Sequence, residues 1–154
     1  MHFLVDIMFL YVIVNCNRDK RRFNAMAYVS QADKKELAPA IKAVLKKYDM
    51  KATIAVRNHS TLVVKVKSGA IDFTDFANPY QNGYIDVNVY WIDSHYSGVA
   101  RDFLNELLDA MKGVKYFNND DAMSDYFSRS HYTDIEIGQY NRAYVCTANE
   151  LEAA

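Results

Sequence analysis

The first regular pattern of apolar and polar positions begins at Ser30, in the stretch SQADKKELAPAIKAVLKKYDM. Its apolar residues recur at the three- and four-residue spacing of one helix face. They are Leu37, Ile41, Val44, Leu45 and Tyr48. Ser30 suits the N-cap, because Asp33 follows three residues later as in a capping box. An interior proline removes a backbone hydrogen bond, so Pro39 predicts a bend near Glu36 or two short helices.

Two short runs rich in β-branched residues follow, at 51–57 and 61–67. Apolar and other residues alternate in both, as in strands with one buried face. The intervening Asn-His-Ser predicts the turn of a β-hairpin, with Asn58 suited to positive φ. His59 is therefore expected at a hairpin tip, and no residue near it in the sequence offers it a catalytic partner.

Both kinds of pattern recur farther along the chain. Strict alternation in YIDVNVYWID predicts a strand over 84–93 with one apolar face, and SGVARDFLNELLDAMKG returns to helical spacing over 97–113. The glycine that closes this second run suits the end of a helix. Residues 119–127 (NDDAMSDYF) predict a short helix or an ordered loop, and 131–140 (HYTDIEIGQY) predict a last strand.

The predicted order is therefore α-β-β-β-α-(α)-β. It indicates an α+β fold in which a mainly antiparallel sheet of about four strands carries two main helices on one face. The chain has 154 residues, which suits one domain. We expect this domain to span 26–148, followed by a short C-terminal tail at 149–154.

The first 25 residues form a separate question, because the apolar run HFLVDIMFLYVIVNC is followed by the basic cluster NRDKRR. A membrane helix needs about 20 apolar residues, and this run is shorter and contains Asp6. A secretory signal carries its positive charge before the apolar run, which is not the order here. We favour a leader upstream of a natural start at Met26. A hydrophobic strand or helix packed on the domain and a membrane anchor remain the alternatives.

Charge is divided sharply along the chain, although the net charge is only −1. Residues 1–70 contain 13 Lys and Arg against 5 Asp and Glu, a balance of +8, whereas residues 71–154 contain 5 against 14, a balance of −9. Such an asymmetry bears on the choice of partner. Cys16 and Cys146 match no metal or redox spacing, which favours a reduced protein of the cytoplasm.

Three segments of the chain carry a family resemblance. LAPAIKAVLKKYDMKATIAVRNHSTLVVKVKSGAIDF, IDVNVYWI and DAMSDYFSRSHYTDIEIGQYNRAYV together resemble a family of small proteins of bacteriophages and other mobile elements, related to the large polyvalent protein-associated domains. The similarity runs from about Met26 to Val145. It implies a phage or mobile-element origin, a host bacterial cytoplasm and a role in DNA entry, counter-defence such as anti-restriction, or host takeover. The resemblance assigns no catalytic residues to this chain.

Candidate chemistry is sparse. The sequence holds no phosphate-binding Gly-rich loop, no nucleophile elbow, no paired-cysteine zinc motif and no His-Glu-x-x-His. Two Asp/His pairs could converge as an oxygen/nitrogen metal site. They are Asp93, His95, His131 and Asp134. This site would make the chain a small metal-dependent enzyme acting on nucleic acid, which is the alternative to a non-enzymatic binding protein without a cofactor.

Two sets of side chains are candidates for contact with a partner. The basic set lies on the first predicted helix and consists of Lys34, Lys35, Lys42, Lys46 and Lys47. The acidic and aromatic set consists of Asp120, Asp121, Asp125, Tyr126, Tyr132 and Asp134. The second set could imitate the phosphates of DNA toward a basic host protein, and aromatic residues are enriched at interface cores. The sequence thus favours a protein partner, leaves nucleic acid open and speaks against a membrane. The element order also resembles the double-stranded RNA-binding domain, but SGVARDF stands where that fold opens its second helix with lysines.

Overall fold

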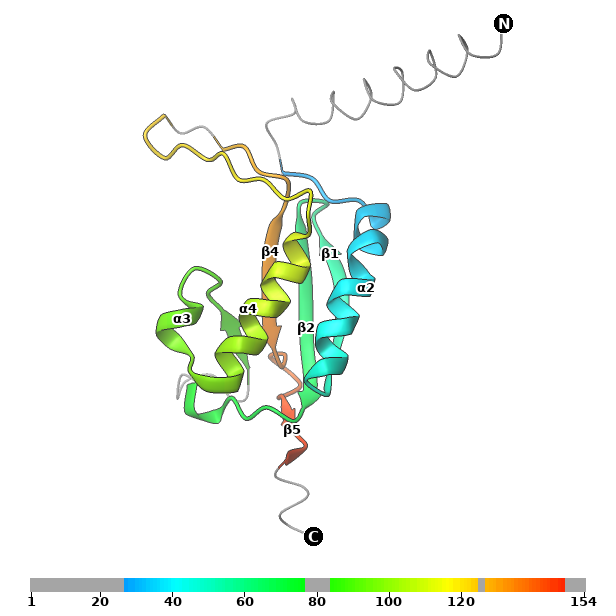
Figure 1. Cartoon of the computed structure of the whole chain (residues 1–154), viewed down its shortest axis with the longest axis vertical. Coiled ribbons are helices and arrows are strands. Elements are labelled where there is room, and N and C mark those ends of the chain that lie inside the picture. Colours follow the sequence, from blue (N-terminus) through cyan, green and yellow to red (C-terminus); the bar gives the residue numbers. More distant parts are fainter. Residues whose placement is uncertain (1–26, 77–83, 125–126, 149–154) are drawn as a thin grey trace, which may run out of the picture.

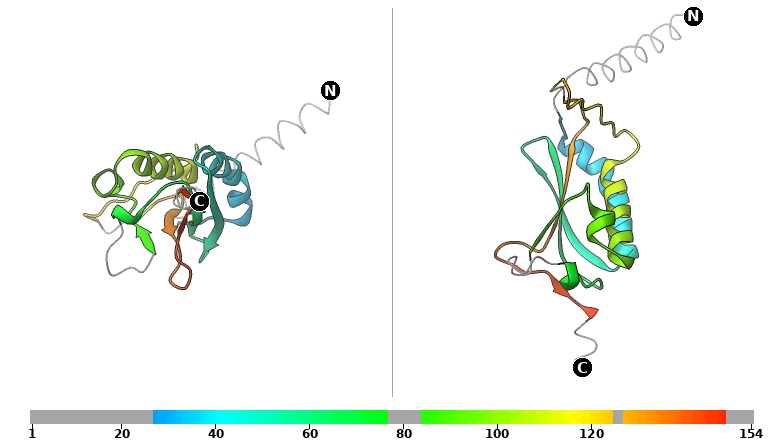
Figure 2. Two further views of the ribbon diagram at one scale, coloured as in Figure 1. Left: turned by 90° about the horizontal axis from the view of Figure 1, so that it is seen from below. Right: turned by 90° about the vertical axis from the view of Figure 1, so that its left-hand side faces the viewer.

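The computed structural model describes residues 27–76, 84–124 and 127–148 (Figure 1). These residues form two layers, a five-stranded sheet and a layer of helices. Both long helices lie on the same face of the sheet, as the view from below shows (Figure 2). The predicted α+β class is confirmed.

The sheet is mixed in direction. Its strands are β1 (Met50–Arg57), β2 (Thr61–Gly69), β3 (Ile85–Val87), β4 (Tyr132–Ile137) and β5 (Val145–Cys146). They lie in the order β1-β2-β4-β3, and β5 pairs with the end of β2. The expected antiparallel pairing holds for β1 with β2 and for β3 with β4, whereas β4 and β5 each run parallel to β2. A parallel pair needs a crossover connection, and the second long helix lies within the one between β2 and β4, whereas the first long helix precedes β1.

The first long helix, α2, runs without interruption over Gln31–Lys47. Ser30 and Asp33 form the predicted capping box, in which each side chain accepts a hydrogen bond from the other residue's backbone N–H. The expected division into two helices at Pro39 does not occur. Pro39 lies on the exposed side of α2, so water can satisfy the Lys35 carbonyl that lacks its helical donor.

The second long helix, α4, spans Gly98–Lys112 and supplies much of the core. Its fully buried residues Phe103, Leu104 and Leu107 face the sheet, where Leu62 and Ile135 are also buried. Residues three and four apart share one face of a helix, which is the pattern that predicted α4. The predicted C-cap glycine, residue 113, is confirmed with a φ of +68°.

The strand predicted over 84–93 is wrong beyond its first residues. Ile85 and Val87 are buried as their alternation predicts, but β3 ends at Val87. The side chain of Asn88 accepts a hydrogen bond from the backbone N–H of Tyr90 (3.1 Å), and its carbonyl accepts one from Trp91 (3.0 Å). Asn is suited to such turns because its side chain bonds to the backbone two residues on. The chain then enters a short helix, α3 (Ile92–His95).

An arm made of residues 114–124 and 127–130 projects from the body of the domain (Figure 1, yellow to orange). Within its described part, an antiparallel bridge joins Asn118 to Arg129, and Asn119 donates its backbone N–H to the carbonyl of Ser128 at 2.7 Å. Residues 119–124 and 127 contain no helix, so the ordered loop of the two expected alternatives is the one observed there.

The described chain begins beside the tip of the hairpin. The backbone N–H of Tyr28 donates to Ser130 (3.0 Å) and that of Val29 donates to His59 (2.7 Å), and Val29 is buried. The predicted leader over 1–25 and the tail over 149–154 lie outside the described residues. Among the helices of the described ranges, none combines the length and the apolar character needed to cross a bilayer.

Candidate functional site

The four residues of the predicted metal site do not converge, and two of them are held near α3. Asp93 accepts a hydrogen bond from the side-chain amide of Asn105 (2.8 Å). The ring of His95 stacks on Trp91, with 6.3 Å between ring centroids and 19° between planes. Both side chains thus have structural partners at the surface.

The other two members of the predicted site lie elsewhere. His131 is buried, with Nε2 2.9 Å from the carbonyl of Met111 at the end of α4. Burial lowers the pKa of this histidine. Asp134 accepts a hydrogen bond from Arg57 at 2.8 Å on the far side of the sheet. Within the described ranges, no group of three or more His, Cys, Asp or Glu side chains is placed to hold a metal ion. The predicted convergence is therefore wrong.

His59 lies where the sequence places it, at the tip of the β1–β2 hairpin. Asn58 and His59 have φ values of 53° and 55°, and Ser60 closes the turn by donating to the carbonyl of Arg57 (3.2 Å). Positive φ at both central residues is typical of a hairpin turn. The exposed imidazole stacks on Tyr28 at 6.4 Å. These contacts support a structural role for His59.

The predicted acidic set is largely engaged within the molecule. Asp120 forms an ion pair with Arg129. Asp121 accepts hydrogen bonds from the hydroxyl of Ser124 (2.7 Å) and the backbone of Met123 (2.9 Å), and these bonds lower its pKa. Asp125 and Tyr126 lie outside the described residues. A continuous path of free carboxylates along the arm is therefore not observed in its described part.

The face of the sheet opposite the helices carries a compensated charge network. Arg57 reaches across the strands to Asp134 and to Glu136, and Lys65 pairs with Glu136 at 3.3 Å. Glu136 is buried by these contacts. Desolvation raises the pKa of Asp86, and the neighbouring carboxylate of Asp134 raises it further. Opposite charges in contact cancel at a distance, so this face offers little net field to a charged partner.

The lysines of α2 divide into two groups. Lys47 binds both carboxylate oxygens of Glu106 on α4, at 2.8 and 2.9 Å, and Tyr48 donates its hydroxyl to the same carboxylate at 2.7 Å. The hydrogen bond from Lys47 is the main reason why the pKa of Glu106 is lowered. Lys34 is half-buried. Lys47 is therefore engaged by an ion pair within the domain, and Lys34 is less exposed than the other lysines of α2.

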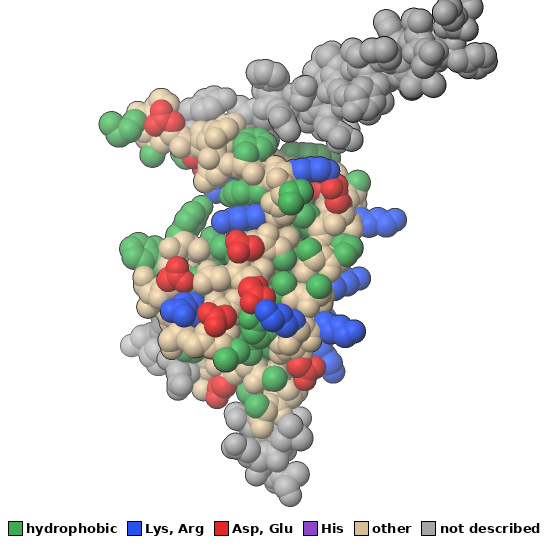
Figure 3. All heavy atoms as spheres, viewed as in Figure 1, with side chains coloured by type: hydrophobic (Ala, Val, Ile, Leu, Met, Phe, Trp, Pro, Cys, Tyr) green, Lys and Arg blue, Asp and Glu red, His purple; other side chains and the backbone are tan. Residues whose placement is uncertain are grey.

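The remaining three lysines, Lys35, Lys42 and Lys46, form an exposed stripe along α2. They are spaced seven and four residues apart, close to two turns and one turn of 3.6 residues, so they lie on one side of the helix. None of them forms an ion pair with a described residue. Figure 3 shows basic side chains along the edge of the molecule formed by α2.

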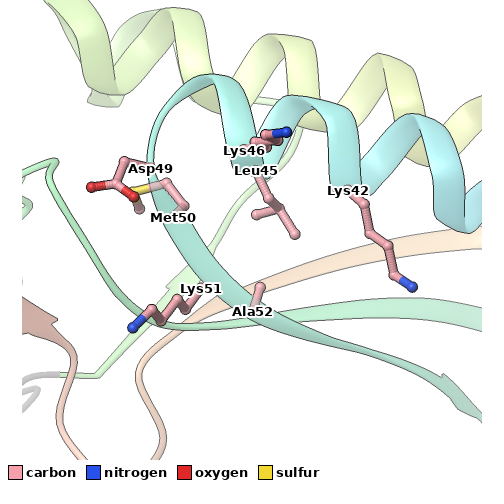
Figure 4. A pocket seen from close by; sticks show the side chains of 7 residues that line it. All are labelled: Lys42, Leu45, Lys46, Asp49, Met50, Lys51 and Ala52. Atoms are coloured by element: carbon pink, nitrogen blue, oxygen red, sulfur yellow. The ribbon is translucent and has the colours of Figure 1, made fainter.

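A groove of about 420 Å³ continues this stripe onto the edge strand β1 (Figure 4). Leu45 and Ala52 lie between α2 and β1 in its floor, and the amino groups of Lys42 and Lys51 extend at its two ends. Lys51 forms no ion pair with any residue of the described ranges either. We call Lys35, Lys42, Lys46 and Lys51 the lysine edge. The sequence set contained its first three members together with the half-buried Lys34 and with Lys47, which is paired with Glu106, and it missed Lys51.

Comparison of the chain with protein-family models, curated proteins and solved structures found no match in any of the three.

Proposed function

We propose that this chain is a non-enzymatic accessory protein of a phage or mobile element, and that its lysine edge binds nucleic acid. The biological setting rests on the resemblance of three sequence segments to small mobile-element proteins. The binding activity rests on the structure of the α2–β1 edge. The sequence alone favours a protein partner for the acidic half, whereas the contacts of the individual charges favour the lysines as the first contact site.

The observation that carries the proposal is the difference between the two sets of charges. Asp120 and Asp134 are paired with arginines of the same domain, and Asp121 caps a turn. The four lysines of the lysine edge have no ionic partner among the described residues. An unpaired ammonium group on the surface attracts a polyanion without first breaking an internal contact.

The spacing of the lysines suits a phosphate backbone. Lys35 and Lys46 are eleven residues apart, which corresponds to about 16 Å along a helix at 1.5 Å per residue. A duplex carries one charge per about 1.7 Å of its axis, so a phosphate lies within reach of each lysine. Contacts of this kind position a protein on nucleic acid without reading its sequence. We therefore expect binding that is weakly selective for sequence.

The test measures binding of a labelled 20-base-pair duplex by fluorescence anisotropy between 50 and 200 mM salt. Four phosphate contacts predict a slope of about −3.6 for the logarithm of the binding constant against the logarithm of salt concentration, since each contributes about −0.9. The triple variant Lys35→Gln, Lys42→Gln and Lys46→Gln should bind more weakly, with the slope reduced to about −0.9.

The matched control changes three basic residues away from this edge. Lys67, Lys112 and Arg142 form no ion pair with a described residue, and their replacement by Gln alters the net charge by the same amount. This control should keep the slope of the unmodified protein. Equal loss of binding in both triple variants, or no measurable binding at 50 mM salt, would refute a specific role for the lysine edge.

A further inference from the structure

A second surface, at the opposite edge of the sheet, exposes aromatic side chains. Tyr90 and Trp91 follow β3 in the turn set by Asn88, and 72% and 56% of their respective surfaces are exposed. Tyr132, at the start of the adjacent strand β4, is 39% exposed. Figure 3 shows hydrophobic side chains that stand out from the edge of the molecule near α3. Side chains of this size are buried on average, so neighbouring exposed ones are informative.

Arg129 of the arm holds two of these rings in place. Its Nη1 donates to the hydroxyl of Tyr90 at 3.0 Å, and its guanidinium lies 4.6 Å from the centroid of the Tyr132 ring. Only 13% of the arginine side chain is exposed, and its charge is paired with Asp120. The contact thus joins the β3–α3 turn to the end of the arm and the adjoining start of β4, since Tyr90 and Arg129 are 39 residues apart.

Trp91 is held separately by the stacked imidazole of His95. The three rings are therefore fixed before any partner arrives. Binding then requires little further ordering of side chains, and that ordering is one of the main costs of association. Trp and Tyr are also the residues most enriched among binding hot spots.

The charge around these rings is negative. Asp93 lies two residues from Trp91 in α3, at the surface, and its carboxylate has no ion pair with a described residue. Arg129 adds no free positive charge, because Asp120 neutralises it. Exposed rings attract cations over their faces, and arginine is the cation most often found there.

We propose that Tyr90, Trp91 and Tyr132 form a docking surface, the aromatic face, for a protein partner that presents an arginine-rich segment. Guanidinium groups would stack on the rings of Tyr90 and Trp91, beside Tyr132, while the carboxylate of Asp93 attracts the same segment. Nucleic acid fits this surface poorly, because phosphates would meet this carboxylate. The aromatic face lies at the β3 edge and the lysine edge lies at the β1 edge, so either proposal can fail without the other.

The experiment uses Trp91 as its own reporter, because it is the single tryptophan of the chain. The full chain is titrated with a peptide of nine arginines, and the emission of Trp91 is recorded. We expect a saturable change in emission. A peptide of nine glutamates should produce none, and one of nine lysines should bind more weakly than arginine because its ammonium groups stack less well on rings.

Variants locate the contact. Tyr90→Ala should weaken binding by about two- to five-fold, the range supplied by one exposed cation–π contact, whereas Tyr90→Phe keeps the ring but loses the hydrogen bond from Arg129 and should weaken binding less than Tyr90→Ala. The matched control is Tyr140→Ala, since Tyr140 is 90% exposed on the loop between β4 and β5. Far-ultraviolet circular dichroism confirms that each variant is folded. Unchanged Trp91 emission, equal binding of the glutamate peptide, or equal weakening by Tyr140→Ala would overturn the proposal.

Discussion

Replacement of Gly113 by alanine tests how the end of α4 is joined to α2. Gly113 has a φ of 68° and a ψ of −177°, a conformation that is essentially restricted to glycine and costs other residues about 1–3 kcal/mol. A Cβ at this position would also lie 2.5 Å from Cδ2 of Leu37 on α2. Such an overlap forces the end of the half-buried Leu37 side chain to rotate away, at a cost of about 0.5–1.5 kcal/mol.

The loss of flexibility in the unfolded chain offsets about 0.4–1 kcal/mol of these costs. We therefore expect Gly113→Ala to lower the free energy of unfolding by about 1–4 kcal/mol, measured by urea denaturation. Gly98→Ala is the matched control, because Gly98 also has a positive φ of 58° but its Cβ would meet no atom within 4 Å. Only backbone strain acts there, so the loss should stay below about 1.5 kcal/mol.

A double-mutant cycle separates the two causes. Leu37→Ala removes the atom that Cβ of residue 113 would meet, so the two substitutions together should cost about 0.5–1.5 kcal/mol less than the sum of the single ones. Strain at residue 113 is unaffected and should persist. A coupling energy near zero, or a Gly98→Ala loss as large as that of Gly113→Ala, would refute this account of the α2–α4 junction.

Three further predictions concern stability. Phe103→Ala should lower the free energy of unfolding by about 3–5 kcal/mol in urea denaturation, because the ring is fully buried against Tyr48; a loss below about 1 kcal/mol would contradict that packing. Burial lowers the pKa of His131 in the folded protein, so its contribution to stability is complete above about pH 6.5 and is lost as the pH falls from there toward the folded pKa. Thermal melting between pH 5 and 8 should show this loss in the native chain and not in His131→Gln. His59→Asn should change stability by at most about 0.5 kcal/mol, since asparagine tolerates positive φ; a larger loss in urea denaturation would show that the stacking on Tyr28 matters.

Local signals in the sequence account for the elements that were predicted well. The capping box at Ser30, the helical spacing that ends at Gly113 and the Asn58 turn each depend on residues within a few positions of one another. The predicted continuation of β3 beyond Val87 is wrong, and the reason is also a local interaction. Its alternation continued in the sequence, but one local hydrogen bond to the Asn88 side chain favours the turn.

The direction of β4 and the partners of the charges depend on long-range contacts. Arg57 and Asp134 are 77 residues apart in the chain. The sequence alone cannot show whether such a carboxylate is paired or free. The same applies to Arg129 and Tyr90, which are 39 residues apart. The sequence therefore identified Tyr132 and Asp134 as a candidate surface without revealing that one supports the aromatic face and the other an ion-pair network.

Because of the strand order, strands from the basic and acidic halves of the sequence lie on different sides of the sheet. β1 and β2 come from the basic half of the chain and lie side by side, whereas β4 and β3 come from the acidic half and form the other side of the sheet. The lysine edge and the aromatic face consequently lie at opposite edges, with no residue in common. Substitutions at distant sites usually act additively, so the lysine triple variant should leave the Trp91 response to the arginine peptide intact, and Tyr90→Ala should leave the salt dependence of duplex binding intact. Independent responses would show that the two surfaces are separate, whereas a loss of both activities in either variant would indicate one shared surface.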